Sequence, residues 1–156
     1  MFDSSQRGLQ AIQWWLYWKL PTLWWWGVKV KILTEDRCAI SMRYSWFNQN
    51  PFRSAYFAAL CGAGELSTGL LVQQKTRELD MSMLLVSIEA RFVKKATGII
   101  TFTCTEGQRI AEYVLAAKQT SEGITFDAIS TGINKEGAVV AELKITWSLR
   151  QRRKLV

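Results

Sequence analysis

One carboxylate stands alone in the middle of the chain, in a segment of small and apolar residues. Glu65 is the only acidic residue between Arg53 and Lys75. Burial would disfavour the charged form of such a carboxylate, which raises its pKa and can make it a general base near neutral pH. Two other placements stay open: Glu65 can face solvent on an exposed helix stripe, or serve as a structural carboxylate at a dimer seam.

The residue types that are present narrow the chemistry further. The sequence contains three cysteines and no histidine, so catalysis must use carboxylates, hydroxyls, backbone amides or cysteine. Cys61 precedes Glu65 by one helical turn, but without a histidine to activate its thiol we interpret it as a small buried hydrophobe rather than a nucleophile. Because the cysteines are odd in number and far apart, we expect neither disulfides nor a metal site, and a cytoplasmic location.

A helix is predicted to carry Glu65, from Asn50 to about Gln73. Asparagine is a favoured N-cap, and Pro51 suits the first helical position. The helix is rich in glycine, alanine and serine, so other elements can approach it closely. Each glycine disfavours an isolated helix by about 1 kcal/mol relative to alanine. Tertiary packing must therefore stabilise this helix, and we expect it to be the buried axis of the domain.

Most of the remaining chain is predicted to form antiparallel strands. Alternation of apolar and polar residues, or β-rich composition, predicts strands over residues 37–46, 82–93, 99–104, 124–132 and 138–149. Residues 134–137, Asn-Lys-Glu-Gly, are typical of a hairpin turn. A short surface helix is expected over residues 106–118, with a capping box from Thr105 to Gln108.

Length and charge limit the function classes. A chain of 156 residues, 49% hydrophobic and 21% charged, fits a single domain with one packed core. The net charge of +7 favours polyanionic ligands, and the cations cluster at residues 91–95 and in a basic tail over residues 151–156. A solvated turn and a frayed tail are the simpler interpretation of both clusters. Nucleic-acid binding is not expected, because no recognised RNA- or DNA-binding motif is present.

The N-terminal segment, residues 1–27, is rich in tryptophan. Six of the eight tryptophans lie between Trp14 and Trp26, and Lys19 and Pro21 interrupt the run, so we do not expect it to span a bilayer. We expect a helix and strap that packs on a sheet, on a partner subunit, or over an acyl pocket. Weak contact with a membrane surface is the alternative, because indole combines an apolar ring with a polar N–H.

Several segments resemble a known family. Residues 44–48, 50–60 and 64–69 resemble the central-helix region of hotdog-fold acyl thioesterases, and residues 133–137 and 146–148 are also similar to an uncharacterised bacterial branch of that superfamily. The resemblance covers about residues 28–150. It implies an α+β hotdog fold, in which a curved antiparallel sheet of five or six strands wraps around a long central helix, as a single domain over residues 1–156. It also implies a homodimer or homotetramer with acyl-thioester sites at the subunit boundary.

The resemblance also suggests roles for individual residues. Glu65 falls at the position of the family's catalytic acid, which acts as a base on water or as a nucleophile, and Asn50 resembles an asparagine near the thioester. Where the family usually has His-Gly-Gly, this chain has Tyr56-Phe57-Ala58, so an amide of Phe57 or Ala58 would hold the oxyanion.

The expected activity is hydrolysis of an acyl-CoA or acyl-carrier-protein thioester. Arg91, Lys94 and Lys95 are candidates to meet the phosphates of CoA, which is part of the substrate, and neither a cofactor nor a metal is expected. The alternative is a non-catalytic module that binds acyl chains or lipids. Phe57 in place of a family glycine favours that alternative, because its side chain can crowd the approach to the amide.

Overall fold

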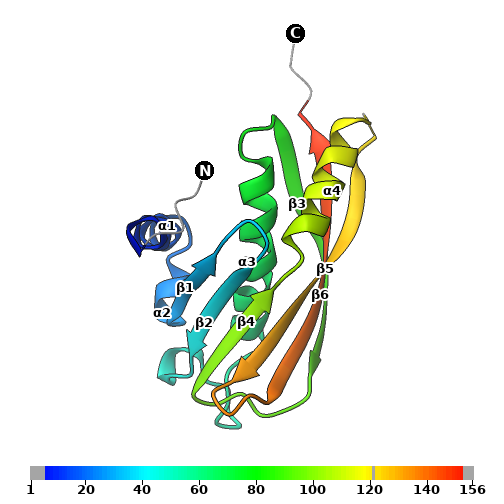
Figure 1. Ribbon diagram of the computed structural model, residues 1–156. Coiled ribbons are helices and arrows are strands. Elements are labelled where there is room, and N and C mark those ends of the chain that lie inside the picture. Colours follow the sequence, from blue (N-terminus) through cyan, green and yellow to red (C-terminus); the bar gives the residue numbers. More distant parts are fainter. Residues whose placement is uncertain (1–5, 121, 153–156) are drawn as a thin grey trace.

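The computed structural model describes residues 6–120 and 122–152, and Figure 1 shows a curved sheet with a long helix along its inner face. In chain order the elements are α1 (Gln6–Lys19), α2 (Thr22–Trp25), β1 (Val28–Leu33), β2 (Cys38–Arg43), the 3-10 helix η1 (Trp46–Asn48), α3 (Phe57–Thr76), β3 (Met81–Phe92), β4 (Ile99–Cys104), α4 (Gly107–Lys118), β5 (Ile124–Asn134) and β6 (Val139–Gln151).

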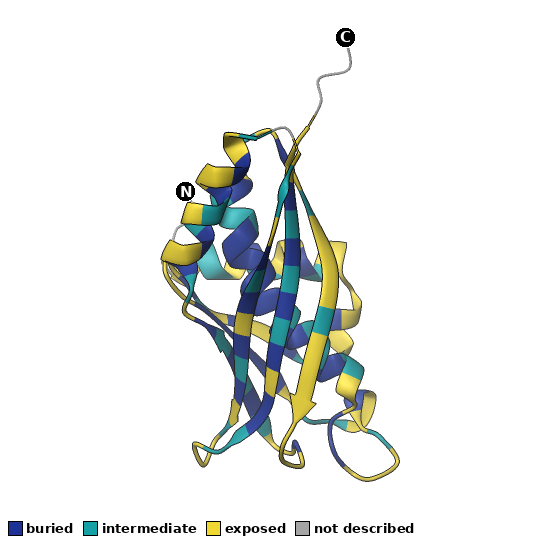
Figure 2. Cartoon of the chain, turned by 90° about the vertical axis from the view of Figure 1, so that its right-hand side faces the viewer, coloured by how far each residue is buried: buried dark blue, intermediate teal, exposed yellow. Residues whose placement is uncertain are grey.

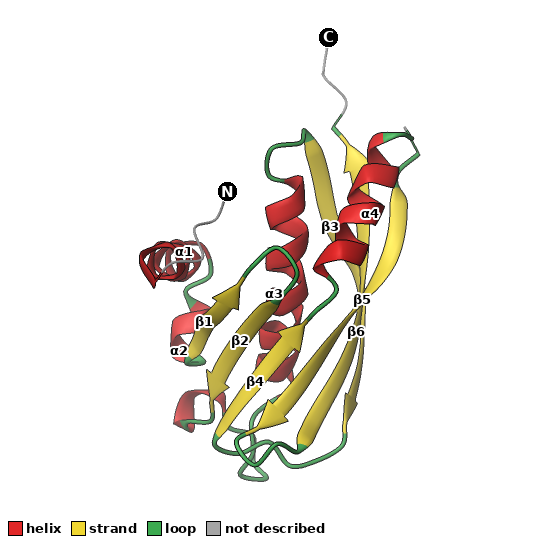
Figure 3. Cartoon of the chain, in the orientation of Figure 1, coloured by secondary structure: helices red, strands yellow, loops and turns green. Residues whose placement is uncertain are grey.

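The six strands form one antiparallel sheet in the order β1-β2-β4-β5-β6-β3. Helix α3 packs against the concave side of this sheet, and α4 covers one end of it (Figure 3). The predicted α+β architecture, with a curved antiparallel sheet around a long helix, is confirmed. The strand predicted over residues 138–149 is also confirmed as β6, in which every second residue from Ala141 to Leu149 is buried.

Small residues let the sheet approach α3 closely, as the sequence predicts. A Cβ added at Gly64 would lie 3.0 Å from Leu143 Cδ2 and 3.2 Å from Phe102 Cδ1. More than half of the helix is buried: Ala59, Leu60, Ala63, Gly64, Leu66, Ser67, Thr68, Gly69, Leu70, Leu71, Val72 and Thr76. Helix α3 is therefore the axis of the core.

The start of this helix differs from the prediction. Asn50 does not cap α3; its Oδ1 accepts hydrogen bonds from the backbone N–H groups of Phe52 (2.9 Å) and Ser54 (3.2 Å). This is an Asx turn, which asparagine forms as readily as a helix cap. The Ala55 N–H then donates to the carbonyl of Ala96 (2.8 Å), which keeps the chain extended until the helix begins at Phe57.

Two further local predictions are wrong. The strand predicted over residues 37–46 ends at Arg43. The side-chain amide of Asn48 donates to the carbonyls of Arg43 (2.8 Å) and Trp26 (2.9 Å), and these bonds hold residues 46–48 in η1.

Helix α4 lacks the predicted capping box. Its N-cap is Glu106 and no side chain bonds the cap. Strand β1 was not predicted, and residues 153–156 of the basic tail lie outside the described residues.

The N-terminal helices cover one edge of the sheet. Gln13 of α1 accepts from the Val30 N–H (2.7 Å) and donates to the Val28 carbonyl (3.2 Å), and the Tyr17 hydroxyl donates to the same carbonyl (2.9 Å). These side chains form hydrogen bonds with backbone groups on the outer edge of β1, where a neighbouring strand would otherwise bind. Trp26, just after α2, lies against α3, where a Cβ on Gly62 would be 3.0 Å from its ring.

The opposite edge of the sheet is open. Strand β3 pairs with β6 along one side, and none of the other described elements pairs with its outer side. In Figure 2 it is the long, mostly exposed strand at the edge of the sheet. Leu84, Leu85 and Val86 are exposed along it. An exposed apolar edge strand is a template for pairing with another chain.

Candidate active site

Glu65 lies in the middle of α3 and is half-buried. Gly69, one turn later, lets the carboxylate and an indole pack closely against the helix. A Cβ added at Gly69 would lie 3.0 Å from Glu65 Oε1 and 3.2 Å from Cζ2 of Trp147 on β6. The carboxylate and the indole therefore lie side by side over Gly69, between the helix and the sheet.

The Glu65 carboxylate has no hydrogen bond or ion pair with any residue in the described ranges. Loss of solvation on burial raises the pKa of this carboxyl group from its ordinary 4.5 to about 7. A base with a pKa near the working pH exchanges protons efficiently in both directions. The arrangement therefore suits a group that takes up a proton from water and gives it back.

A hydrogen-bond chain fixes the indole beside Glu65. The Nε1–H of Trp147 donates to the Thr68 hydroxyl (3.0 Å), which in turn donates to the Glu65 carbonyl (2.9 Å). Thr68 and Trp147 are both buried. The sequence analysis did not name either residue as part of the site, although Thr68 and Trp147 both lie in segments that resemble the thioesterase family. The contact joins positions 79 residues apart, so no local pattern could reveal it.

Cys61 lies half-buried on α3, one turn before Glu65. Burial raises the pKa of its thiol, which disfavours the nucleophilic thiolate. This environment agrees with its interpretation as a small hydrophobe. Among residues 6–120 and 122–152, no group of three or more cysteine and carboxylate side chains lies close enough together to hold a metal ion.

The N-terminus of α3 opens into a cavity of about 530 Å³. Asn50, Phe57, Lys94 and Lys95 line it, together with neighbouring residues of the turn before α3 and of the segment after β3. Four of the residues singled out from the sequence therefore meet in one place. The backbone N–H groups of Phe57 and Ala58 have no acceptor among the described residues, as is usual in the first turn of a helix.

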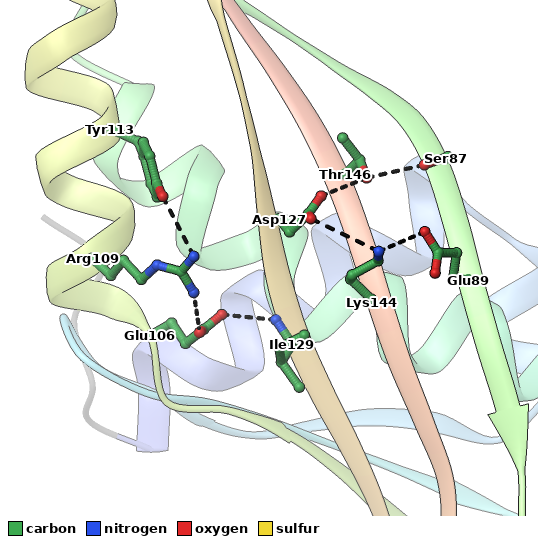
Figure 4. Close-up of polar contacts among 9 residues, drawn as sticks. All are labelled: Ser87, Glu89, Glu106, Arg109, Tyr113, Asp127, Ile129, Lys144 and Thr146. Carbon is green, nitrogen blue, oxygen red and sulfur yellow. Dashed lines mark hydrogen bonds and ion pairs between the residues drawn. The ribbon is translucent and has the colours of Figure 1, made fainter.

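Arg91 lies elsewhere. Its side chain is on the outer face of the sheet, where it forms an ion pair with Glu142 of β6 (3.8 Å). Figure 4 shows the neighbouring contacts on that face, in which Lys144 pairs with Glu89 (2.6 Å) and with Asp127 (4.0 Å). The cluster predicted at residues 91–95 is thus divided between the outer face of the sheet and the loop after β3, where Lys94 and Lys95 line the cavity.

Glu65 does not line the cavity at the start of α3. Eight residues separate it from Phe57 along the helix, which is about 12 Å at roughly 1.5 Å per residue. A general base and an oxyanion donor must each lie about 3 Å from the atoms on which they act. The carboxylate and the free amides of a single α3 are therefore too far apart to act on one carbonyl group.

Comparison with known proteins places the chain in a family. Residues 8–149 match the family model described as domain of unknown function DUF4442. The protein belongs to the DUF4442 family. A search of curated protein sequences found no match for this DUF4442 protein.

Solved structures share the fold of this DUF4442 protein. A Pseudomonas aeruginosa protein of unknown function, called a probable thioesterase, is similar with a TM-score of 0.82 at 20% identity, over 92% of this chain and 95% of its own. A Chlorobaculum tepidum protein of unknown function has a TM-score of 0.78 at 12% identity, over 92% and 94% of the two chains. A Haemophilus influenzae thioesterase has a TM-score of 0.66 at 14% identity, over 97% and 96%. The chain therefore shares the hotdog fold of these proteins.

Proposed function

We propose that this protein hydrolyses acyl thioesters, with CoA or an acyl-carrier protein as the thiol carrier. The observation that carries the proposal is Glu65, a half-buried carboxylate with a pKa of about 7 on the central helix of a thioesterase-like fold. Free cysteine thiols fit the reducing cytoplasm, where we propose that the protein acts.

In the proposed reaction, the Glu65 carboxylate removes a proton from a water molecule while the water oxygen attacks the thioester carbonyl carbon. The carbonyl oxygen becomes an oxyanion, which the N–H of Phe57 or Ala58 stabilises at the positive end of a helix. The intermediate then collapses, the C–S bond breaks, and the thiolate takes the proton back from Glu65. The products are a carboxylic acid and the free thiol, and the enzyme returns to its starting state.

We propose that two copies of the chain build each site. The distance of about 12 Å along α3 keeps the base and the amides of one copy apart, so a second helix must supply one of them. The open edge of β3, with its exposed Leu84 and Val86, offers a surface for such a partner. Pairing between two β3 strands would extend the sheet and bury these side chains in a homodimer, which can assemble further into a homotetramer.

Lys94 and Lys95 are the proposed contacts for the phosphates of CoA. Both line the cavity at the start of α3, where ammonium groups can meet phosphate oxygens at the entrance to the site. Asn50 is the proposed positioning residue, although its side chain also bonds the turn before the helix. Arg91 is left out of this proposal because it pairs with Glu142 on the outer face of the sheet.

The direct test is a panel of acyl-CoA and acyl-carrier-protein esters of increasing chain length, assayed by release of free thiol. Glu65→Gln keeps the shape of the side chain and removes the base, so turnover should fall by about a hundredfold or more. Glu112→Gln, on the exposed side of α4, is the matched control and should keep the wild-type rate. Full activity in Glu65→Gln would reject the assigned base.

A pair of variants tests the oxyanion donor. Tyr56 has φ −67° and ψ 136°, a conformation that suits the residue before a proline, so Phe57→Pro fits the backbone and removes one N–H. Phe57→Ala removes the ring and keeps the N–H. If this amide holds the oxyanion, the proline variant should lose about 10²–10³ in kcat while the alanine variant stays active. Equal activities would assign the donor elsewhere.

Mixing two inactive proteins tests whether the site is shared. A mixed dimer of Glu65→Gln and Phe57→Pro subunits has one site with an intact base from one copy and an intact amide from the other. Equal mixing should restore about a quarter of the wild-type rate, because half of the dimers are mixed and one of their two sites is complete. A site contained in a single chain would stay inactive after mixing.

The second candidate function is binding of acyl chains without turnover. Phe57 favours it: its side chain is 54% exposed, lines the cavity and packs against Tyr56 with ring centroids 4.7 Å apart. Both rings line the cavity that a thioester would have to enter to reach the amides at the start of α3. Stoichiometric binding of acyl-CoA without release of thiol, by both wild type and Phe57→Ala, would favour this candidate over the enzyme.

A further inference from the structure

Large aromatic side chains are exposed at the β1 edge of the molecule, and six of them define what we call the aromatic face: Trp14, Trp18, Trp24, Trp25, Trp46 and Phe47. They come from α1, α2 and η1, which lie along one margin in Figures 1 and 3. Trp18 is 83% exposed and Trp46 is 76% exposed. A cluster of this kind on a soluble domain marks a surface for interaction.

The aromatic face is not required by the core. Helices α1 and α2 are anchored by the buried side chains of Ile12, Leu16 and Leu23, and Gln13 and Tyr17 bond to β1. The tryptophans point away from these anchors. The folding of the segment therefore does not explain why its outward positions are indoles rather than polar side chains.

Ring contacts join the aromatic face across its separate elements. The ring centroids of Tyr17 on α1 and Trp24 on α2 are 5.6 Å apart, and those of Phe47 on η1 and Trp25 on α2 are 5.1 Å apart. The ring of Trp46 is a further 5.3 Å from that of Phe47. These contacts restrict the rings of Trp24, Trp25, Trp46 and Phe47, so ordering these four side chains on a partner costs little conformational entropy.

The chain segment that carries four of the six residues of the aromatic face has charges of one sign. Between residues 6 and 34 there is no carboxylate, and the charged side chains are Arg7, Lys19, Lys29 and Lys31. All four are exposed. Arg7 and Lys19 flank the tryptophans at the two ends of α1, and the lysines of β1 lie on the strand that α1 covers. The surface is thus complementary to an anionic partner.

We propose that the aromatic face binds the surface of a membrane that contains anionic phospholipids. Indole rings favour the boundary between headgroups and acyl chains, because their apolar body and N–H are satisfied there together. Cations next to such rings add attraction to anionic lipid. In the described part of the chain no helix combines the length and apolar character needed to cross a bilayer, so the contact lies at the interface.

A second copy of the chain fits this surface less well. Isologous pairing of two aromatic faces would bring their cations together with no carboxylate to compensate, whereas the β3 edge offers a second copy an uncharged row of Leu84, Leu85 and Val86. The two surfaces lie at opposite edges of the sheet. The proposal does not depend on thioester hydrolysis and would hold for a protein that only binds acyl chains.

Co-sedimentation of the full chain with vesicles tests the proposal. The vesicles contain either phosphatidylcholine alone or phosphatidylcholine with about 30 mol% phosphatidylglycerol, which provides the negative surface potential. We expect binding to the anionic vesicles, with a blue shift of tryptophan fluorescence, and binding at least about tenfold weaker to the neutral ones. Absence of binding to both vesicle types would overturn the proposal.

Matched variants locate the contact. Trp18→Ser with Trp24→Ser should weaken binding to anionic vesicles by at least about tenfold, whereas Leu115→Ser, at a residue of α4 that is 60% exposed, should leave it unchanged. Arg7→Gln and Lys19→Gln should each weaken it about fivefold. Circular dichroism verifies the fold of each variant.

Two results would overturn the assignment to a membrane. One is equal vesicle binding by the wild type and the double tryptophan variant. The other is a lower oligomeric state of that variant in sedimentation velocity without lipid, because the aromatic face would then be a contact between copies of the chain.

Discussion

Replacing Glu65 by glutamine should make the protein more stable at high pH. Burial raises the pKa of Glu65 from 4.5 to about 7, so the folded state holds this proton more tightly than the unfolded state. The stabilisation from the protonated carboxyl group is complete below pH 4.5 and is lost as the pH rises through 7. The difference between the two pKa values corresponds to about 3 kcal/mol.

Glutamine does not ionise, so Glu65→Gln escapes this loss. At pH 8 the free energy of unfolding of the variant should exceed that of the wild type by up to about 3 kcal/mol, and at pH 4.5 the two should be nearly equal. Urea unfolding of both proteins between pH 4.5 and 8.5 measures this difference in the free energy of unfolding. The contributions of the other titrating groups are the same in both proteins and cancel.

The exposed residue Glu112 provides the control. Glu112→Gln, measured over the same pH range, removes an exposed carboxylate in place of the half-buried one. A difference between wild type and Glu65→Gln that stays constant over the whole range would refute the reasoning, because it would mean that the Glu65 carboxylate is as well solvated in the folded state as in the unfolded chain.

Three other substitutions test the packing and hydrogen bonding of the fold. Gly107→Ala should lower the free energy of unfolding by about 1–3 kcal/mol, because a Cβ there would collide with the backbone of residues 35–36; an unchanged urea midpoint would contradict this. Trp147→Phe should cost about 1 kcal/mol by removing the bond to Thr68, and its thermal unfolding temperature should fall accordingly rather than stay constant. Gln13→Ala leaves the edge of β1 without two hydrogen bonds and should cost about 1–2 kcal/mol. Light scattering on heating should show earlier aggregation for this variant, and identical curves would count against its role at the edge.

Local sequence patterns predicted the elements in which apolar and polar residues recur at a regular spacing along the chain. Strand β6 alternates from Ala141 to Leu149, and the hairpin before it ends in Gly137, which has the positive φ (80°) that such a turn requires. The predicted start of α3 was wrong, because the sequence Asn50-Pro51 fits a helix start and an Asx turn equally well. The hydrogen bond from Ala55 to Ala96 decides between them, and it joins distant parts of the sequence.

The candidate site could be predicted in part for the same reason. Glu65 stands out because it is the one carboxylate in a long apolar segment, and its half-buried position follows from the helix that carries it. The contact between Thr68 and Trp147 depends on how β6 crosses α3, and the division between Arg91 and Lys94 depends on where β3 ends. Both are tertiary features that spacing along the chain does not contain.

The rate of thiol release from acyl-CoA as a function of pH, for wild type and Glu65→Gln together, tests the central claim most directly. If Glu65 is the base, kcat/KM of the wild type should rise with pH through a pKa near 7 and level off above it, because the free carboxylate is the active form. The variant should show no such rise and only the background rate. An equal rate and an equal pH profile for both proteins would contradict the account.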